Sequence, residues 1–201
     1  MNISKNIIIT GVGGQGNVLA ARLLAVAALE AGMEVSVGDV YGLTQRGGSV
    51  ASHVRWSTQR RLPPLVPKGK LDVLVAFEPM EALRMQTQYG RRDTVVLVND
   101  EPVLPIGVQA GRFEYPDWQR LSEMINKISG RVWMVPGSRA ARELGNIQVL
   151  NSIMIGSLLA SGVTGLNQAD FEAIIISQIP KKHASLNLKA FRRGRELIKG
   201  L

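Results

Sequence analysis

The strongest constraint on the fold of this 201-residue chain is a glycine-rich loop between a predicted strand and a predicted helix. Residues 6–10 form a β-branched run, typical of a strand buried on both faces of a parallel sheet. The loop 11–16 follows, and an apolar pattern over 17–31 then predicts a helix that ends at Gly32. A second strand is predicted at 34–40. This strand–loop–helix–strand unit is the strongest local structural signal in the chain.

The rest of the chain continues to alternate strands with helices. Further strands are predicted at 49–56, 71–77, 94–99 and 131–135, and helices are predicted to start near Glu78 and Asp117. Alternation within 49–56 predicts one wetter strand face. The last helices are predicted at 138–144, 149–161, 167–178 and 185–199. We therefore expect one domain, a three-layer Rossmann-like α/β core over 1–136 with a mainly parallel sheet, and a helical C-terminal part over 137–201.

The composition excludes several kinds of site. The chain contains no cysteine, which excludes disulfides, thiolate metal sites, a cysteine nucleophile and an iron–sulfur cluster held by this chain. Its two histidines, His53 and His183, lie far apart and do not predict a metal site. No apolar run of about 18 residues predicts a membrane span, and the N-terminus lacks a signal-peptide layout. We therefore expect a cytoplasmic protein with no membrane partner.

The net charge of +8 is concentrated near the C-terminal end. Residues 181–199 carry seven basic side chains and one acidic side chain, while the remainder is nearly balanced. Few aromatic residues accompany these charges, so a surface that stacks nucleic-acid bases is not predicted. A solvated helix face or a subunit contact is the favoured interpretation.

The first glycine-rich loop has the spacing G-x-G-x-x-G at Gly11, Gly13 and Gly16. Glycine permits backbone angles closed to other residues and lets a ligand approach the amides at the start of a helix. Asp39 follows where a dinucleotide fold places its ribose-binding acid. Because this fingerprint has many false positives, the loop alone fits NAD binding and a tight structural turn about equally well.

A second glycine-rich loop spans residues 42–49 and contains Arg46 between Gln45 and the pair Gly47-Gly48. The Arg46 guanidinium could present a fork of donors to a carboxylate or a phosphate. Residue types alone slightly favour a flexible strand connection. Both loops, however, should emerge at the carboxyl edge of the sheet, where open α/β folds bind their ligands. Their pairing therefore predicts a binding site at that edge.

The remaining polar residues predict no catalytic apparatus. Glu78 also ends a strand at this edge, but a helix-start residue is its favoured role. His53 is interpreted as a satisfied or half-exposed histidine rather than a base. Arg84, Arg91 and Arg92 are interpreted as surface charges at a helix end. No Ser-His-Asp order or paired-carboxylate spacing can be defended.

Together, the two loops resemble a known family. The segments Gly11-Val12-Gly13-Gly14-Gln15-Gly16 and Tyr41-Gly42-Leu43-Thr44-Gln45-Arg46-Gly47-Gly48-Ser49-Val50 are similar to the paired signature of the gamma-type subunit of 2-oxoacid:ferredoxin oxidoreductases. Within that family, residues 77–84 and 186–191 resemble the small (beta) subunit of indolepyruvate oxidoreductase. The resemblance extends from Gly11 to Phe191.

The resemblance implies a chemistry that the residues alone do not show. These enzymes oxidatively decarboxylate a 2-oxoacid on thiamine diphosphate, pass electrons through iron–sulfur clusters to ferredoxin and form an acyl-CoA. The large subunit holds the thiamine and the clusters, which agrees with the absence of cysteine here. By this resemblance, the loops lie near the approach of coenzyme A. The cofactor-binding candidates are Gly11, Gly13, Gly14, Gln15, Gly16, Gln45, Arg46, Gly47, Gly48 and Ser49.

Three functional hypotheses follow from the sequence. The favoured one is the small subunit of such an oxidoreductase, acting on an aryl-pyruvate such as indolepyruvate and inactive without its large subunit. The alternative is a stand-alone NAD-binding Rossmann dehydrogenase, for which no credible proton donor is predicted. A basic binding module would rest on residues 181–199 alone.

Overall fold

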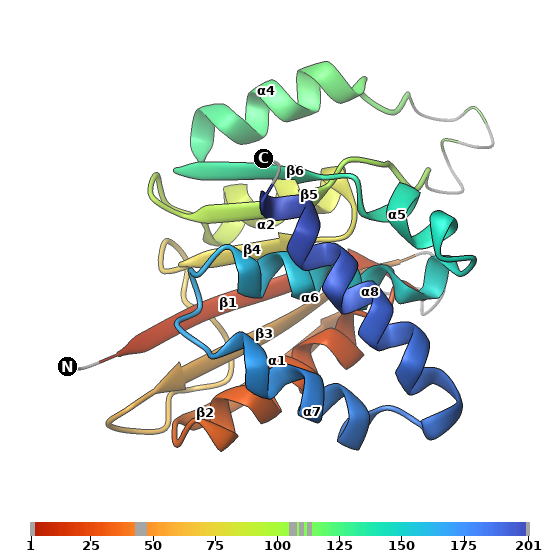
Figure 1. The fold of residues 1–201 in the computed structure, drawn as a ribbon. Coiled ribbons are helices and arrows are strands. Elements are labelled where there is room, and N and C mark those ends of the chain that lie inside the picture. Colours follow the sequence, from red (N-terminus) through yellow and green to blue (C-terminus); the bar gives the residue numbers. More distant parts are fainter. Residues whose placement is uncertain (1–2, 43–47, 105–107, 109–110, 112–113, 200–201) are drawn as a thin grey trace.

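The computed structural model describes residues 3–42, 48–104, 108, 111 and 114–199. A six-stranded sheet with the order β2-β3-β1-β4-β5-β6 lies at its centre (Figure 1). Its strands are β1 (Ser4–Val12), β2 (Glu34–Tyr41), β3 (Ser49–Ser57), β4 (Val73–Ala76), β5 (Val95–Asn99) and β6 (Arg131–Val135). Strand β3 runs antiparallel to β1 and β2, and the pairs from β1 through β4 and β5 to β6 are parallel. The predicted mainly parallel sheet is confirmed, with one reversed strand.

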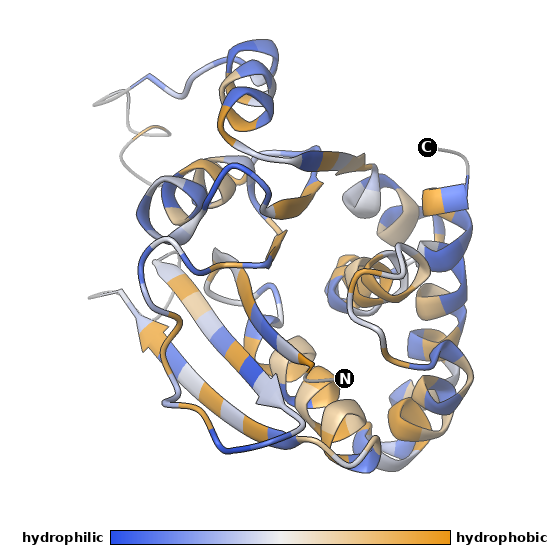
Figure 2. Ribbon diagram, turned by 90° about the vertical axis from the view of Figure 1, so that its left-hand side faces the viewer, coloured by the Kyte–Doolittle hydropathy of each residue, from blue (hydrophilic) through white to orange (hydrophobic). Residues whose placement is uncertain are grey.

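Helices cover both faces of the sheet, which confirms the predicted three-layer architecture (Figure 2). One face carries α1 (Asn17–Glu30), α5 (Gly137–Glu143), α6 (Leu150–Ala160), α7 (Gln168–Gln178) and α8 (Lys181–Lys199), and the other carries α2 (Pro79–Tyr89) and α4 (Trp118–Ile128). Successive strand residues point to opposite faces. Ile7 and Ile9 therefore pack against the first helix layer, while Ile8 packs against the second. A short 3₁₀ turn at Ile147–Val149 leads into α6.

The helix ends follow local signals in the sequence. The side chain of Glu78 accepts a hydrogen bond from the Glu81 amide and caps α2, and Asp117 caps α4 in the same way. Helix α8 begins at Lys181 rather than at the predicted Ser185. The carbonyl of Pro180 accepts hydrogen bonds from the first-turn amides, so the helix starts directly after this proline.

Strand β3 lacks the wetter face predicted from its alternation. It is buried along its length apart from a half-buried Ser49. Two of its polar side chains, Arg55 and His53, find partners in the segment after β3, which folds back over them. His53 Nε2 and Trp56 Nε1 have no partner among the described residues. The Arg55 guanidinium donates to the carbonyls of Pro63 and Leu65 at 2.7 and 3.0 Å, and His53 Nδ1 accepts from the Val66 amide. The polar residues of this strand predicted a solvent-exposed face, but in the structure these residues are buried and bonded to other parts of the protein.

Candidate functional site

The described ends of the second glycine-rich loop lie beside the first loop at the carboxyl edge of the sheet, the edge that the strand directions predict. Val12 at the end of β1 is paired with Ser49 at the start of β3. The Gly13 amide donates a 2.8 Å hydrogen bond to the Gly48 carbonyl. Of the predicted second-loop residues, Gly48 and Ser49 are described, while Gln45, Arg46 and Gly47 lie outside the described residues. The described ends of the second loop therefore contact the first loop directly.

The first loop, the start of α1 and the described residues that flank the second loop line a cleft of about 790 Å³. This volume lies within the usual range for small-molecule sites of roughly 300–1,000 Å³. The cleft is lined by Gly13, Gly14, Gly16, Asn17, Val18, Tyr41, Gly42 and Val50. Asn17, Val18, Tyr41, Gly42 and Val50 line the cleft without having been predicted from the sequence as binding residues. None of the described lining residues is acidic, and α1 has no acidic residue in its first turn. The cleft therefore favours an anionic or neutral ligand.

The first loop is held by its own side chains. Gln15 Oε1 accepts from the Val12 amide at 2.7 Å, and Gln15 Nε2 donates to the Phe77 carbonyl at 3.1 Å. Gln15, a predicted binding residue, thus ties the loop to β1 and to the end of β4. A Cβ on Gly11 would lie 2.5 Å from this same Gln15 side chain, so Gly11 is needed for close packing.

Two loop glycines have backbone angles that favour glycine. Gly14 has φ of 103° and Gly16 has φ of 84°. Gly16 occupies the N-cap of α1 and supplies no side-chain cap, which leaves first-turn amides free of a capping side chain. Asn17 follows and is buried, and its Oδ1 atom has no hydrogen-bond partner among the described residues. At the start of α1, glycines with positive φ therefore lie next to backbone amides without a side-chain cap and next to the unpartnered Asn17 Oδ1.

We expect Gly16→Ala to destabilise the protein by about 2 kcal/mol. A left-handed backbone costs roughly 1–2 kcal/mol for a residue with a Cβ, and this Cβ would also lie 2.7 Å from Asn151 Nδ2. Gly14→Ala is the matched control, because its Cβ would meet nothing within 4 Å. Urea unfolding of both variants gives the measurement. Equal losses in the free energy of unfolding would show that the contact with Asn151 does not contribute to the destabilisation.

Comparison with known proteins assigns the family. A model of the pyruvate ferredoxin/flavodoxin oxidoreductases matches residues 6–197. The chain belongs to this family. The indolepyruvate oxidoreductase subunit IorB of Thermococcus kodakarensis is 37% identical over 190 residues, which cover 94% of this chain and 93% of the relative. The match therefore includes both glycine-rich loops and the C-terminal helices.

Solved structures have the same fold. The gamma subunit of a keto/oxoacid ferredoxin oxidoreductase from Geobacter sulfurreducens gives a TM-score of 0.71 at 23% identity, over 98% of this chain and 99% of that chain. A 2-oxoglutarate:ferredoxin oxidoreductase from Magnetococcus marinus, with 2-oxoglutarate, coenzyme A and succinyl-CoA bound, gives a TM-score of 0.74 at 23% identity. It covers 98% of this chain but 31% of the Magnetococcus chain. There, the fold is one part of a chain about three times as long.

The geometry of this family member does not favour the dehydrogenase alternative. In a dinucleotide-binding Rossmann sheet, the strand that carries the ribose-binding acid lies next to the first strand. Here β3 lies between β1 and β2, so Asp39 on β2 is one strand further from the glycine loop. Its carboxylate also accepts a 2.5 Å hydrogen bond from Ser52 Oγ. The Asp39 side chain therefore links β2 to β3 and does not lie beside the glycine loop.

Glu78 has the structural role that was predicted for it. Its buried carboxylate caps α2 at 2.9 Å from the Glu81 amide and accepts a hydrogen bond from the Tyr115 hydroxyl. Burial raises the pKa of Glu78, and the hydrogen bonds from Tyr115 and from the backbone oppose this shift. The hydrogen bond from Tyr115 therefore joins Glu78, just after β4, to the chain that follows residues 100–113.

The surface charges have more partners than predicted. Arg84 pairs with Glu81, and Arg91 pairs with Asp72 and Asp93 at 2.6 and 3.0 Å, whereas Arg92 is exposed. On the basic helix α8, Arg192 and Arg195 pair with Glu172 of α7, and Arg193 pairs with Glu143 of α5. These arginines hold helices together, and a free basic surface made by them is not favoured.

The described part of the chain contains neither a cluster of metal ligands nor a membrane-spanning helix. No group of three or more potential metal ligands comes together there. No helix in the same residues is long and apolar enough to cross a membrane.

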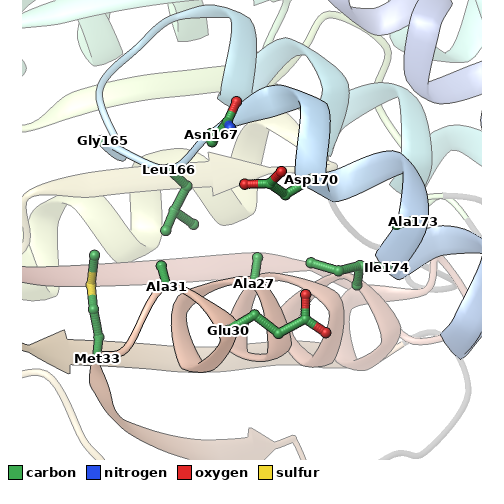
Figure 3. Close-up of a pocket in the computed structure, with 10 residues that line it drawn as sticks. All are labelled: Ala27, Glu30, Ala31, Met33, Gly165, Leu166, Asn167, Asp170, Ala173 and Ile174. Carbon is green, nitrogen blue, oxygen red and sulfur yellow. The ribbon is translucent and has the colours of Figure 1, made fainter.

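A separate pocket of about 520 Å³ lies between α1 and α7 (Figure 3), with Glu30 and Asp170 among its lining residues. It contains none of the predicted site residues.

His53 is a buried neutral histidine rather than a base. Its ring is fully buried, its Nδ1 accepts from the Val66 amide at 3.1 Å, and it stands edge-on to the Tyr89 ring. Protonation at Nδ1 would replace this hydrogen bond with two opposed donors. Burial lowers the pKa of His53, Arg55 lowers it further, and Asp39 opposes the shift.

We expect the His53 shift to make the protein less stable in mild acid. Below the unfolded-state pKa of about 6.5, His53 is protonated in the unfolded chain but not in the folded chain. The free energy of unfolding therefore decreases as the pH is lowered. The slope from one such group is at most about 1.4 kcal/mol per pH unit. His53→Asn can keep an acceptor for Val66 and removes the titration. Urea unfolding between pH 7.5 and 5.5 should show a flatter profile for the variant, and parallel profiles would contradict this account.

Proposed function

We propose that this chain is the small subunit of a cytoplasmic, thiamine diphosphate-dependent 2-oxoacid:ferredoxin oxidoreductase that acts on an aryl-pyruvate such as indolepyruvate. In this proposal the complex decarboxylates the 2-oxoacid oxidatively, forms an acyl-CoA and passes electrons to ferredoxin. The near full-length similarity to an indolepyruvate oxidoreductase subunit carries the proposal. Because this chain has no cysteine, the iron–sulfur clusters are assigned to a large partner subunit, together with thiamine diphosphate.

The cleft at the two loops is proposed as the contribution of this subunit to coenzyme A binding. Its volume fits part of such a ligand, and its described lining includes the start of α1, with its free backbone amides, and no acidic side chain. Backbone amides at a helix N-terminus stabilise phosphate oxygens through hydrogen bonds and the helix dipole. The small residues Gly13, Gly14 and Gly16 permit close approach of the ligand to the backbone.

The test is to purify the chain from its native source and to identify its stoichiometric partner by mass spectrometry. We expect a large, cysteine-rich, thiamine-binding subunit. The complex is then assayed with indolepyruvate, 2-oxoglutarate and pyruvate, each with coenzyme A and ferredoxin. Fastest turnover of indolepyruvate supports the aryl-pyruvate proposal. Preference for another 2-oxoacid would correct the substrate, and recovery of no such partner would overturn the function.

Arg46 gives a test of the second loop. We expect Arg46→Lys to lower kcat/KM of the complex about tenfold, because lysine keeps the charge but loses the planar fork that grips a carboxylate or phosphate. One charge-assisted hydrogen bond is worth roughly 1.5–3 kcal/mol. Arg92→Lys, on an exposed residue, is the control. The neighbouring Arg91 is a poorer control, because it forms ion pairs with Asp72 and Asp93. Unchanged kinetics in an intact complex would leave the loop with a structural role only.

A further inference from the structure

A smaller pocket adjoins the first glycine-rich loop and is called here the α8 pocket. It has a volume of about 270 Å³. The residues of its lining that matter here are Gly14 and Gly16 of the loop, Asn151 of α6, and Pro180, His183 and Asn187 around the start of α8. The two glycines also line the cleft, so the cleft and the α8 pocket are adjacent at the loop. The volume lies just below the range of roughly 300–1,000 Å³ for complete small-molecule sites, so it fits one group of a larger ligand.

The wall of the α8 pocket contains an unused hydrogen-bond donor. Asn151 is 3% exposed, and its Oδ1 accepts a 2.7 Å hydrogen bond from the Ser152 amide. This bond fixes the orientation of the side-chain amide, because only the oxygen can accept from an N–H. The Nδ2 atom therefore lies on the side of Gly16, and it donates to no atom of the described residues. An acceptor on a ligand would satisfy this donor.

The start of α8 makes the same pocket favourable for an anion. The Pro180 carbonyl accepts from the His183 amide, whereas the amides of Lys181 and Lys182 donate to no atom of the described residues. The first turn has no acidic residue, and a helix N-terminus stabilises negative charge. Both lysines are exposed and form no ion pair within the described part of the chain. Three arginines further along α8 are paired with carboxylates of α5 and α7, so the free positive charge of the helix lies at its start.

The walls of the α8 pocket are fixed by contacts between α6 and α8, which pack against each other (Figure 1). Asn187 Oδ1 accepts from Ser152 Oγ at 2.6 Å, and Asn187 Nδ2 donates to the His183 carbonyl at 2.9 Å. None of the described lining residues is acidic. The pocket is thus preformed, and its unused donors and its charge match a phosphate group.

We infer that the α8 pocket binds the phosphate monoester on the ribose of coenzyme A, while the diphosphate of the same molecule lies at the start of α1. The inference rests on the proposed function, which supplies coenzyme A as the ligand. A ligand that reaches the N-termini of both helices needs two separate anionic groups, and coenzyme A carries this phosphate in addition to its diphosphate. Its oxygens accept from Asn151 Nδ2 and from the free amides of the first turn of α8. A nucleotide that has only the diphosphate leaves these donors unused.

The test compares coenzyme A with dephospho-coenzyme A, which lacks only this phosphate, in calorimetric titrations of the complete complex. We expect the native complex to bind coenzyme A about tenfold more tightly, since charge-assisted hydrogen bonds are lost with the phosphate. His183→Glu places a carboxylate in the pocket lining and should remove this preference. Ser185→Glu is the matched control, because it makes the same charge change at an exposed position of α8 outside the lining. It should keep the preference within about twofold.

Two further measurements locate the phosphate. Asn151→Asp keeps the acceptor for the Ser152 amide and removes the Nδ2 donor, so it should also abolish the preference for coenzyme A. Circular dichroism establishes that each variant is folded, and His183→Glu, at an exposed residue, decides the matter if Asn151→Asp does not fold. In the native complex, hydrogen exchange of residues 181–187 should be slowed by coenzyme A and not by dephospho-coenzyme A.

The outcomes separate the α8 pocket from the proposed function. If the native complex binds both nucleotides equally well, or if His183→Glu behaves like Ser185→Glu, the α8 pocket does not bind this phosphate and the inference is wrong while the function stands. Slower exchange of residues 181–187 with inorganic phosphate, without a difference between the nucleotides, would assign the pocket to free phosphate and also overturn the inference. If the native complex binds neither nucleotide, the proposed function fails first.

Discussion

Replacing Gly194 by alanine should destabilise the protein by about 2–3 kcal/mol, although alanine is the better helix former. Helices α6 and α8 cross at two glycines, Gly156 and Gly194. A Cβ on Gly194 would lie 2.0 Å from the Ile153 carbonyl oxygen, and a Cβ on Gly156 would lie 2.1 Å from that of Phe191. Backbone atoms of a packed helix cannot move aside as a flexible side chain can. Overpacking of this kind costs about 1–3 kcal/mol and occasionally more.

The sign of this effect distinguishes packing from helix propensity. Propensity alone favours alanine over glycine by about 1 kcal/mol in a helix interior, so an isolated α8 would gain stability. Ser185→Ala on the exposed side of α8 is the control, with an expected change within about 0.5 kcal/mol. Urea unfolding measures both variants. A more stable Gly194→Ala protein would mean that α6 and α8 separate easily and that their crossing contributes little.

The sequence predicted that the two loops lie at the same edge of the sheet, because that edge depends on strand direction. Strands β1 and β2 run the same way, so the loops that follow them reach the same edge of the sheet. The starts of α2 and α4 were also predictable, because Glu78 and Asp117 act on amides only a few residues away. Local signals and strand direction thus placed most of the architecture.

Features that depend on distant packing were not predictable from one sequence. The position of β3 between β1 and β2 is decided by tertiary pairing, and it moves Asp39 away from the loop. The burial of Arg55 depends on a connection that follows β3. Asn17 becomes a buried residue at the site only in the folded structure, where Asn151 packs against the neighbouring Gly16. Spacing in the sequence carries no signal for these contacts.

The purified chain alone is expected to show no 2-oxoacid oxidation and no visible iron–sulfur absorbance. It contains no cysteine to ligate a cluster, and its sequence lacks a GDG motif with a downstream asparagine for thiamine diphosphate. Electrons removed from a 2-oxoacid would therefore have no cluster through which to leave. The assay supplies indolepyruvate, thiamine diphosphate, coenzyme A and a redox dye, first to the isolated chain and then to the chain with its large subunit.

Activity should appear only in the second assay, and the comparison assigns the role of the small subunit. If the large subunit alone turns over indolepyruvate at the rate of the complex, the cleft at the glycine loops contributes nothing to catalysis. If the rate depends on this chain, mainly through KM for coenzyme A, the loops act in binding that substrate. Turnover by the isolated chain would contradict the subunit assignment, because neither the loops nor the buried Glu78 and His53 provide a route for the electrons.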